Sequence, residues 1–221
     1  MSIQNAVRSG KVADCGNSMS PSVERIVSLG AQAILVSPFD GVAYGQLDHI
    51  GVPIIECAEY METSALGRAE WMRFYGALVG REKVADSLFE EVERNYIEWS
   101  DMARKAKTKP RVITERVVSG AWYCPGGKSS MARLIADAGG CYVFADDKHS
   151  GSLTLSPEKV IDKAASADRW LFVGNGKTLM TRRQLLSEYK GYGLLRAFRK
   201  GQVYECLPSN SNPYFEESSF R

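Results

Sequence analysis

The sequence contains only two histidines, His49 and His149, and its five cysteines are widely spaced, with no C-x-x-C pair. Two histidines this far apart form no local zinc motif, and an odd number of cysteines argues against a complete disulfide framework. We therefore interpret most cysteines as buried thiols that pack as small hydrophobic groups. Capture of a bare transition metal is disfavoured as well, because neither histidine nor methionine is clustered.

Long apolar runs and an excess of charge are also lacking. No run approaches the roughly 18 residues that a membrane-spanning helix needs, and residues 1–16 lack the apolar stretch of a signal peptide. The formal net charge of +2 gives no sign of the basic stripe of a nucleic-acid-binding protein. With 221 residues, 44% of them hydrophobic, the chain can form one large domain or two small lobes.

Three signatures of catalysis or nucleotide binding are missing. The chain has neither a G-x-S-x-G elbow nor a G-x-G-x-x-G fingerprint. Gly127-Lys128-Ser129 resembles the end of a P-loop, but Trp122 stands where the first glycine of that motif belongs. Cys124 is a conceivable nucleophile, yet no histidine lies near it in the sequence. We therefore predict that the protein is not an enzyme.

Two α/β regions flank a helical one. Before residue 64, strand and helix patterns alternate, with elements predicted at residues 20–29 (helix), 33–37 (strand), 44–50 (short helix) and 52–56 (strand). After residue 109 they alternate again, at residues 111–115, 141–144, 169–173 and 202–206 (strands) and 129–138, 156–165, 182–189 and 194–198 (helices). Trp122 to Pro125 is interpreted as a bulky turn.

The helical region between them contains few glycines, prolines and β-branched residues. One helix is predicted over residues 65–79 and a longer one over residues 82–106, whose apolar residues recur at intervals of three and four. At 1.5 Å per residue the longer helix would measure roughly 37 Å, which suits a strut between lobes. We therefore expect an N-terminal lobe, a helical linker and a C-terminal lobe at residues 1–63, 64–108 and 109–221.

The pattern around Glu24 returns around Glu158. Each glutamate follows a capping serine by two residues, precedes a basic residue and two β-branched residues, and leads into an apolar strand. Such an echo on either side of a long helix is what two related lobes leave in a sequence. The helix dipole favours an acid in the first turn in any case, so the pattern alone leaves a purely structural role open.

The candidate ligand-contacting residues are aromatic or small and polar. Trp122 and Tyr123 follow a predicted strand, at the end where open α/β sheets bind ligands, and Phe39 and Tyr44 hold the equivalent place in the first lobe. Ser150 follows the strand predicted at residues 141–144. Aromatic and small polar side chains that converge on a cleft suit a large, partly apolar ligand, although Trp122 is equally well explained as a core residue.

A small polar cluster follows the same predicted strand. Asp146, Asp147 and His149 stand close together there and could contact a ligand or a metal, but a solvated loop explains them as well. We keep Asp147 as a candidate ligand-binding residue and predict no metal site.

Several stretches of the chain together resemble one protein family. They are residues 23–29 with 33–36, residues 47–54, residues 65–76 (the strongest stretch), residues 122–127 and residues 150–153. In their order and spacing they resemble the periplasmic binding proteins of iron-siderophore, haem and vitamin B12 ABC importers, those of the Bacteroidetes group in particular. The resemblance runs over nearly the whole chain.

This resemblance implies a fold and a function. It implies an α/β protein with two Rossmann-like lobes joined by a single long helix, which captures an iron-siderophore, haem or corrinoid between the lobes and needs no cofactor. In this family one glutamate on each lobe pairs with arginines of the permease dimer in the inner membrane, and Glu24 and Glu158 match those positions. The implied location is the periplasm, with a lipid anchor on the full-length protein.

The chain departs from the family pattern at both ends. The signal sequence and the early strands of the first lobe are absent, and the chain stops where relatives continue into a final helix. The first lobe is therefore expected to be truncated and to carry an uncovered sheet edge, which favours dimerisation or strand exchange.

Two other classes of protein remain open at this point. One is an enzyme of related fold, such as a chelatase or a metallocluster protein, for which the sequence offers no clear acid–base pair or metal cluster. The other is a scavenging protein that acts without a permease.

Overall fold

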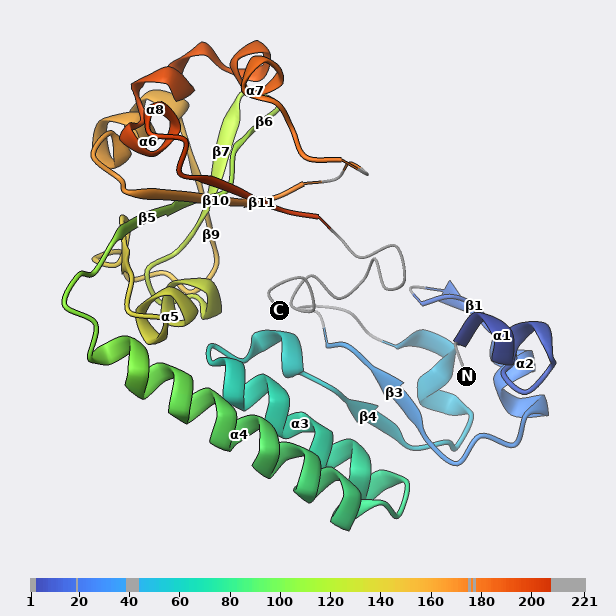
Figure 1. Cartoon of the computed structure of the whole chain (residues 1–221). Helices are drawn as coiled ribbons and strands as arrows, with labels where there is room; N and C mark the ends of the chain where they lie inside the picture. The colour runs from blue at the N-terminus through green and yellow to red at the C-terminus, as the bar shows by residue number, and fades with distance from the viewer. Residues whose placement is uncertain (1–2, 19, 39–43, 175, 177, 208–221) are drawn as a thin grey trace. The chain divides into compact units, whose positions relative to one another are not determined.

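The computed structural model describes residues 3–18, 20–38, 44–174, 176 and 178–207, which form a mixed α/β protein (Figure 1). The chain divides into two compact units, Met1–Met61 and Glu62–Arg221. Both contain parallel strands, so the prediction of an α/β fold is confirmed. In the described part of the chain, no helix combines the length and the apolar character that crossing a bilayer requires.

The first unit is built on a short parallel pair of strands. Its elements are α1 (Ile3–Arg8), β1 (Gly16–Asn17), β2 (Ser20–Pro21), α2 (Val23–Ser28), β3 (Ile34–Val36), η1 (Gly45–His49), β4 (Ile54–Glu56) and η2 (Glu59–Met61). β3 pairs in parallel with β4, with Ile34 opposite Ile54. The predicted helix and both strands are present, each a few residues shorter, and the short helix is of the 3₁₀ type. The β1–β2 hairpin and α1 were not predicted.

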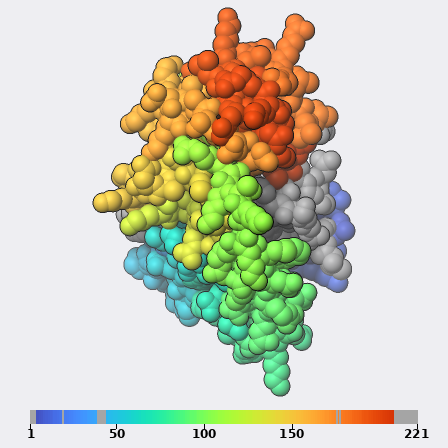
Figure 2. Space-filling model, turned by 60° about the vertical axis from the view of Figure 1, so that its left-hand side comes forward, coloured from blue at the N-terminus to red at the C-terminus, as the bar shows by residue number. Residues whose placement is uncertain are grey.

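Two antiparallel helices open the second unit, α3 (Ala65–Leu78) and α4 (Glu82–Arg104). Gly80, with φ of 63°, forms the turn between them, as expected of a residue that adopts the left-handed conformation without strain. Gly76 of α3 faces Ala85 of α4 so closely that a Cβ on residue 76 would overlap the alanine methyl group. The 23 residues of α4 span about 34 Å, and the helix lies at the surface along much of its length (green in Figure 2).

The long helix is fixed to α5 (Ser130–Asp137), which follows it in the chain. The Tyr96 hydroxyl donates a hydrogen bond to Asp137 Oδ2 at 3.0 Å. Gly139, just after α5, lies so close to α4 that a Cβ there would come within 2.9 Å of the Ala103 carbonyl oxygen. Both helices therefore belong to the second compact unit, and the strut between two lobes stays a prediction.

A four-stranded parallel sheet forms the centre of the second unit (Figure 1). Its order is β11–β10–β5–β8, and the strands are β5 (Arg111–Thr114), β8 (Cys141–Tyr142), β10 (Arg169–Val173) and β11 (Val203–Cys206). The accompanying helices are α5, α6 (Pro157–Ala164), α7 (Arg182–Glu188), η3 (Lys190–Leu194) and α8 (Arg196–Arg199). The strand predicted at residues 141–144 ends early, because the chain turns where the Ala145 N–H donates to the Tyr142 carbonyl oxygen at 3.1 Å.

A second, antiparallel sheet was not predicted. Its order is β6–β7–β9, with strands β6 (Val117–Val118), β7 (Ala121–Pro125) and β9 (Ser152–Leu155). β6 and β7 form a hairpin around Ser119 and Gly120, whose φ angles of 50° and 82° suit a two-residue turn with positive φ at both positions. The interpretation of Trp122 to Pro125 as a turn was therefore wrong, because these residues pair with β9.

Aromatic side chains fill the core of the second unit. Trp122, Trp170 and Tyr192 are fully buried, and the rings of Trp170 and Tyr192 lie 4.6 Å apart. Each indole N–H is satisfied, because Trp122 donates to the Thr114 carbonyl oxygen at 3.0 Å and Trp170 to that of Glu115 at 2.7 Å. A buried indole needs such a partner. The two bonds therefore connect β7 of the antiparallel sheet and β10 of the parallel sheet to the end of β5.

Candidate ligand-binding and docking surfaces

Neighbouring residues of β7 point in opposite directions. Trp122 is 0% exposed and belongs to the core, whereas Tyr123 is 43% exposed. Successive side chains of a strand alternate between the two faces of a sheet, so only one of the two rings can face a ligand. The prediction that Trp122 contacts ligand is therefore wrong, and Tyr123 keeps that role as a candidate.

The outer face of the antiparallel sheet carries Tyr123 among small polar residues. Thr154 pairs with Tyr123, and Ser152 pairs with Pro125. Ser152 and Thr154 are exposed, whereas the alternate residues of β9 are partly buried. Thr154 was missed in the sequence, although the alternation of polar and apolar residues in Ser152–Leu155 was a visible signal of a strand with one exposed face.

A pair of glycines brings the end of β7 against the loop that contains Ser150. The Gly126 N–H donates to the Gly151 carbonyl oxygen at 2.8 Å, and the Lys128 N–H to that of His149 at 3.0 Å. A Cβ on Gly126 would overlap the His149 carbonyl oxygen, and one on Gly127 that of Asp147. The Gly-Gly sequence is thus needed for close backbone contact, which places the exposed Ser150 beside the end of β7.

Asp147 organises this loop. Its Oδ1 accepts hydrogen bonds from the backbone N–H of His149 at 2.8 Å and of Gly127 at 3.5 Å. The backbone N–H of His149 is the main reason why the pKa of Asp147 lies below its usual value. The His149 ring, 3.1 Å from the same oxygen, is the more exposed group. Asp147 therefore has a structural role, and direct contact with a ligand stays a prediction.

The resemblance to a P-loop also has a structural explanation. Ser129, in the position of the motif's hydroxyl residue, is the N-cap of α5, and its Oγ accepts from the Ala132 N–H at 3.2 Å. Ser129 is also buried, with 7% exposure. Its hydroxyl thus satisfies an otherwise unpaired amide of the first helical turn.

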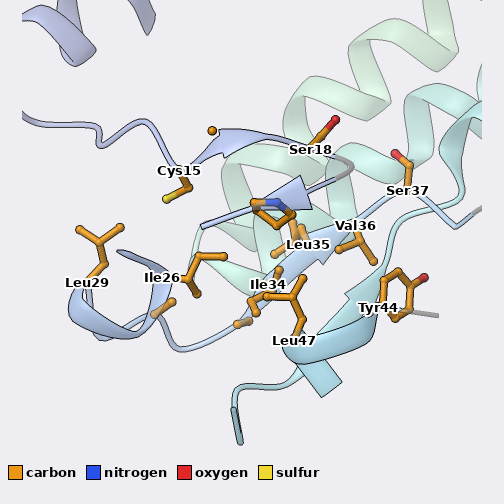
Figure 3. Close-up of a pocket in the computed structure, with 14 residues that line it drawn as sticks. Cys15, Ser18, Ile26, Leu29, Ile34, Leu35, Val36, Ser37, Tyr44 and Leu47 are labelled. Atoms are coloured by element: carbon orange, nitrogen blue, oxygen red, sulfur yellow. The ribbon is translucent and has the colours of Figure 1, made fainter. Parts of the chain in front are cut away.

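In the first unit, Tyr44 lines an apolar pocket of about 650 Å³. Figure 3 shows Ile26, Ile34, Leu35 and Leu47 gathered around it, with Tyr44 at one end. The Tyr44 hydroxyl donates to Glu56 Oε1 at 2.7 Å, and this hydrogen bond is the main reason why the pKa of Tyr44 rises to about 12. Phe39, the other candidate of this unit, lies outside the described residues.

The two glutamates occupy matching positions in separate units. Glu24 lies in the first turn of α2 and Glu158 in the first turn of α6, and both are exposed. The caps match as well: the Oγ of Ser22 accepts from the Arg25 N–H at 3.3 Å, and that of Ser156 from the Lys159 N–H at 3.3 Å. The echo in the sequence is therefore reproduced in local structure.

No metal centre is found in the described part of the chain: nowhere there do three or more histidine, cysteine or acidic side chains gather around a common point. Of the cysteines, Cys124 is fully buried, and burial raises the pKa of its thiol to about 12. A thiol with so high a pKa stays protonated at neutral pH and is a poor nucleophile or metal ligand.

Comparison with known proteins identifies the family. The sequence profile of the family described as periplasmic binding protein matches residues 2–209. An uncharacterized lipoprotein of Methanocaldococcus jannaschii is 28% identical over 207 residues, which cover 91% of this chain and 49% of that protein. The chain spans about half the length of the curated relatives it matches.

Solved structures share the fold. A periplasmic haem-binding protein of Vibrio cholerae superposes with a TM-score of 0.71 at 16% identity, covering 90% of this chain and 76% of that one. A possible iron-binding, periplasmic solute-binding protein of Staphylococcus epidermidis gives 0.70 at 17% identity, covering 92% and 79%. With the profile match over residues 2–209, the chain belongs to the periplasmic binding protein family.

Proposed function

We propose that the chain is the solute-binding component of an ABC importer, which captures an iron-siderophore, haem or corrinoid and delivers it to a membrane permease. The observation that carries this proposal is the family match over residues 2–209. Relatives of the same fold are named as haem-binding and possible iron-binding proteins, which favours an iron chelate or haem over a corrinoid. The protein would act by binding and not by catalysis.

The chemistry of the exposed sheet face supports a large, partly apolar ligand. Tyr123 offers an aromatic surface, and the hydroxyls of Thr154, Ser152 and Ser150 lie on the same strand pair or the adjoining loop. An aromatic ring stacks on a flat macrocycle or packs against a chelate's apolar arms, while hydroxyls bond its polar edge. Tyr123 is thus the residue we expect to contribute most to affinity in this unit.

Delivery would depend on the two matched glutamates. Both are exposed in the first turn of a helix, where a carboxylate can accept two parallel hydrogen bonds from an arginine of the permease. Charges at the rim of an interface mainly steer the partners and fix their register. A protein that delivers its ligand this way works outside the inner membrane, and the lipoprotein relative favours a lipid anchor.

Ligand binding is tested by titrating the protein with haemin, a ferric hydroxamate siderophore and cyanocobalamin in separate calorimetric experiments. We expect one class to bind at a ratio of one to one, and Tyr123→Ala to weaken that binding on the order of tenfold, as for an aromatic anchor. Tyr204→Ala, which removes an exposed tyrosine of β11, is the control. If none of the three classes binds, the ligand assignment is wrong.

Docking is tested with Glu24→Ala and Glu158→Ala by measuring binding to the importer's permease in lipid nanodiscs. Each variant should bind roughly tenfold more weakly, which corresponds to about 1.4 kcal/mol, while its affinity for the ligand stays unchanged. Glu90→Ala, an exposed glutamate of α4, is the matched control. Unchanged permease binding and normal transport by both variants would mean that the docking role of Glu24 and Glu158 is wrong.

A further inference from the structure

The two docking glutamates differ in one respect. The Tyr189 hydroxyl donates a hydrogen bond to Glu158 Oε1, with 3.4 Å between the oxygens. No comparable bond to the Glu24 carboxylate is found among the residues that the structure describes. Glu158 is thus supported by a residue outside its own helix, 31 positions further along the chain.

Tyr189 is itself firmly placed. It lies between α7 and η3, and its ring meets that of Tyr192 edge to face, with the centroids 5.4 Å apart and an interplanar angle of 82°. Tyr192 is fully buried, and its hydroxyl accepts from the Val117 N–H at 2.7 Å. Gly191 makes room for the Tyr189 ring, because a Cβ on residue 191 would overlap it.

The charge state of the pair suits donation by the tyrosine. Partial burial, followed by the nearby charge of Glu158, raises the pKa of Tyr189 above its ordinary value. The hydroxyl therefore keeps its proton at neutral pH and can donate a hydrogen bond to the Glu158 carboxylate. A carboxylate has about four lone-pair sites, so one bond from Tyr189 leaves a free site on each oxygen for an incoming guanidinium group.

We propose that Tyr189 is a positioning residue for docking to the permease: its hydroxyl, anchored through Tyr192 to the core, holds the Glu158 carboxylate in the orientation that the permease binds. This inference rests on the proposed docking role of Glu158. A freely rotating glutamate loses conformational entropy when its partner immobilises it. A glutamate already held in place loses less, so the hydroxyl increases affinity without contacting the permease.

The test is Tyr189→Phe, which removes the hydroxyl and keeps the ring that packs on Tyr192. Binding of the purified protein to the permease in nanodiscs should weaken roughly threefold, while the melting temperature and the ligand titrations stay as in the wild type. Tyr204→Phe is the matched control, because its hydroxyl bonds Gln202 of the same unit at 2.8 Å. That variant should bind the permease normally.

Double variants separate positioning from a general structural effect. Tyr189→Phe should have no further effect once Glu158→Ala is present, whereas with Glu24→Ala its threefold effect should remain in full. If Glu158→Ala alone leaves docking unchanged, the docking role itself is wrong. If Glu158→Ala weakens docking but Tyr189→Phe does not, or if its effect is the same in both backgrounds, docking stands and the positioning role is wrong.

Discussion

At the scale of single residues, the contrast between Trp122 and Tyr123 shows how the fold assigns roles. Both are large aromatic residues of β7, and one is fully buried while the other is 43% exposed. On the core side of β7, the indole N–H of Trp122 donates a hydrogen bond to the Thr114 carbonyl oxygen. The outer side leaves a phenol ring available to a ligand. Of two chemically similar neighbours, one thus packs in the core, and the other stays a candidate for ligand contact.

Substitution of each residue by alanine should separate the two roles. Trp122→Ala should lower the free energy of unfolding by about 3–5 kcal/mol, since it empties a large space in a packed core. Tyr123→Ala should cost less than about 1 kcal/mol, because its ring is exposed. Chemical denaturation followed by circular dichroism measures both. Equal losses would mean that Tyr123 is a core residue as well.

At the scale of elements, close backbone contacts at glycine set how helices and loops pack. Gly126 and Gly127 bring the loop around Ser150 against the end of β7, and Gly76 lets α3 approach α4. Each contact would be blocked by a Cβ. Glycine costs stability inside a helix, so its presence in α3 is explained by the packing it permits.

We expect Gly76→Ala to destabilise the protein although alanine is the better helix former. The propensity gain of about 1 kcal/mol is outweighed by overpacking against Ala85, which costs about 1–3 kcal/mol. Ser87→Ala, at an exposed position of α4, should change the free energy of unfolding by less than about 0.5 kcal/mol. Thermal unfolding of both variants checks this, and a stabilised Gly76→Ala protein would show that the helices can separate at no cost.

At the scale of the whole molecule, the two units differ in how many hydrophobic side chains they bury. Every member of the hydrophobic core cluster lies between Val112 and Phe198, in the second unit. Among the described residues of the first unit, only Ile26, Leu47 and Cys57 are buried hydrophobic residues. A unit of about 60 residues with so small a core is marginal in stability.

Hydrogen exchange should therefore be uneven along the chain. Amides of β3 and β4 should exchange at least roughly tenfold faster than those of β5 and β10, because local opening costs least where few apolar contacts are lost. Exchange measured by mass spectrometry on peptides from both units tests this expectation. Equal protection would show that the two units unfold together.

Much of this fold follows from local patterns. The helices at Ala65–Leu78 and Glu82–Arg104, the parallel strands and the capping serines before Glu24 and Glu158 all coincide closely with the predicted elements. These features depend on periodicity and on side chains a few residues apart. The pairing of β7 with β9 could not be predicted, because α5 and β8 separate the two strands and pairing over such a distance leaves no local pattern. The β6–β7 hairpin and the alternation in β9 were local signals that the prediction missed.

The sequence by itself determined the order of the main helices and parallel strands, the matched glutamates and the family. Only the tertiary structure decided which ring of β7 is buried, why Gly126 and Gly127 are glycines, and that Tyr189 contacts Glu158. The physical reason is the same in each case. Burial, close backbone approach and hydrogen bonding of these residues depend on atoms contributed by segments far apart in the chain, and the spacing of residues along one segment carries no record of them.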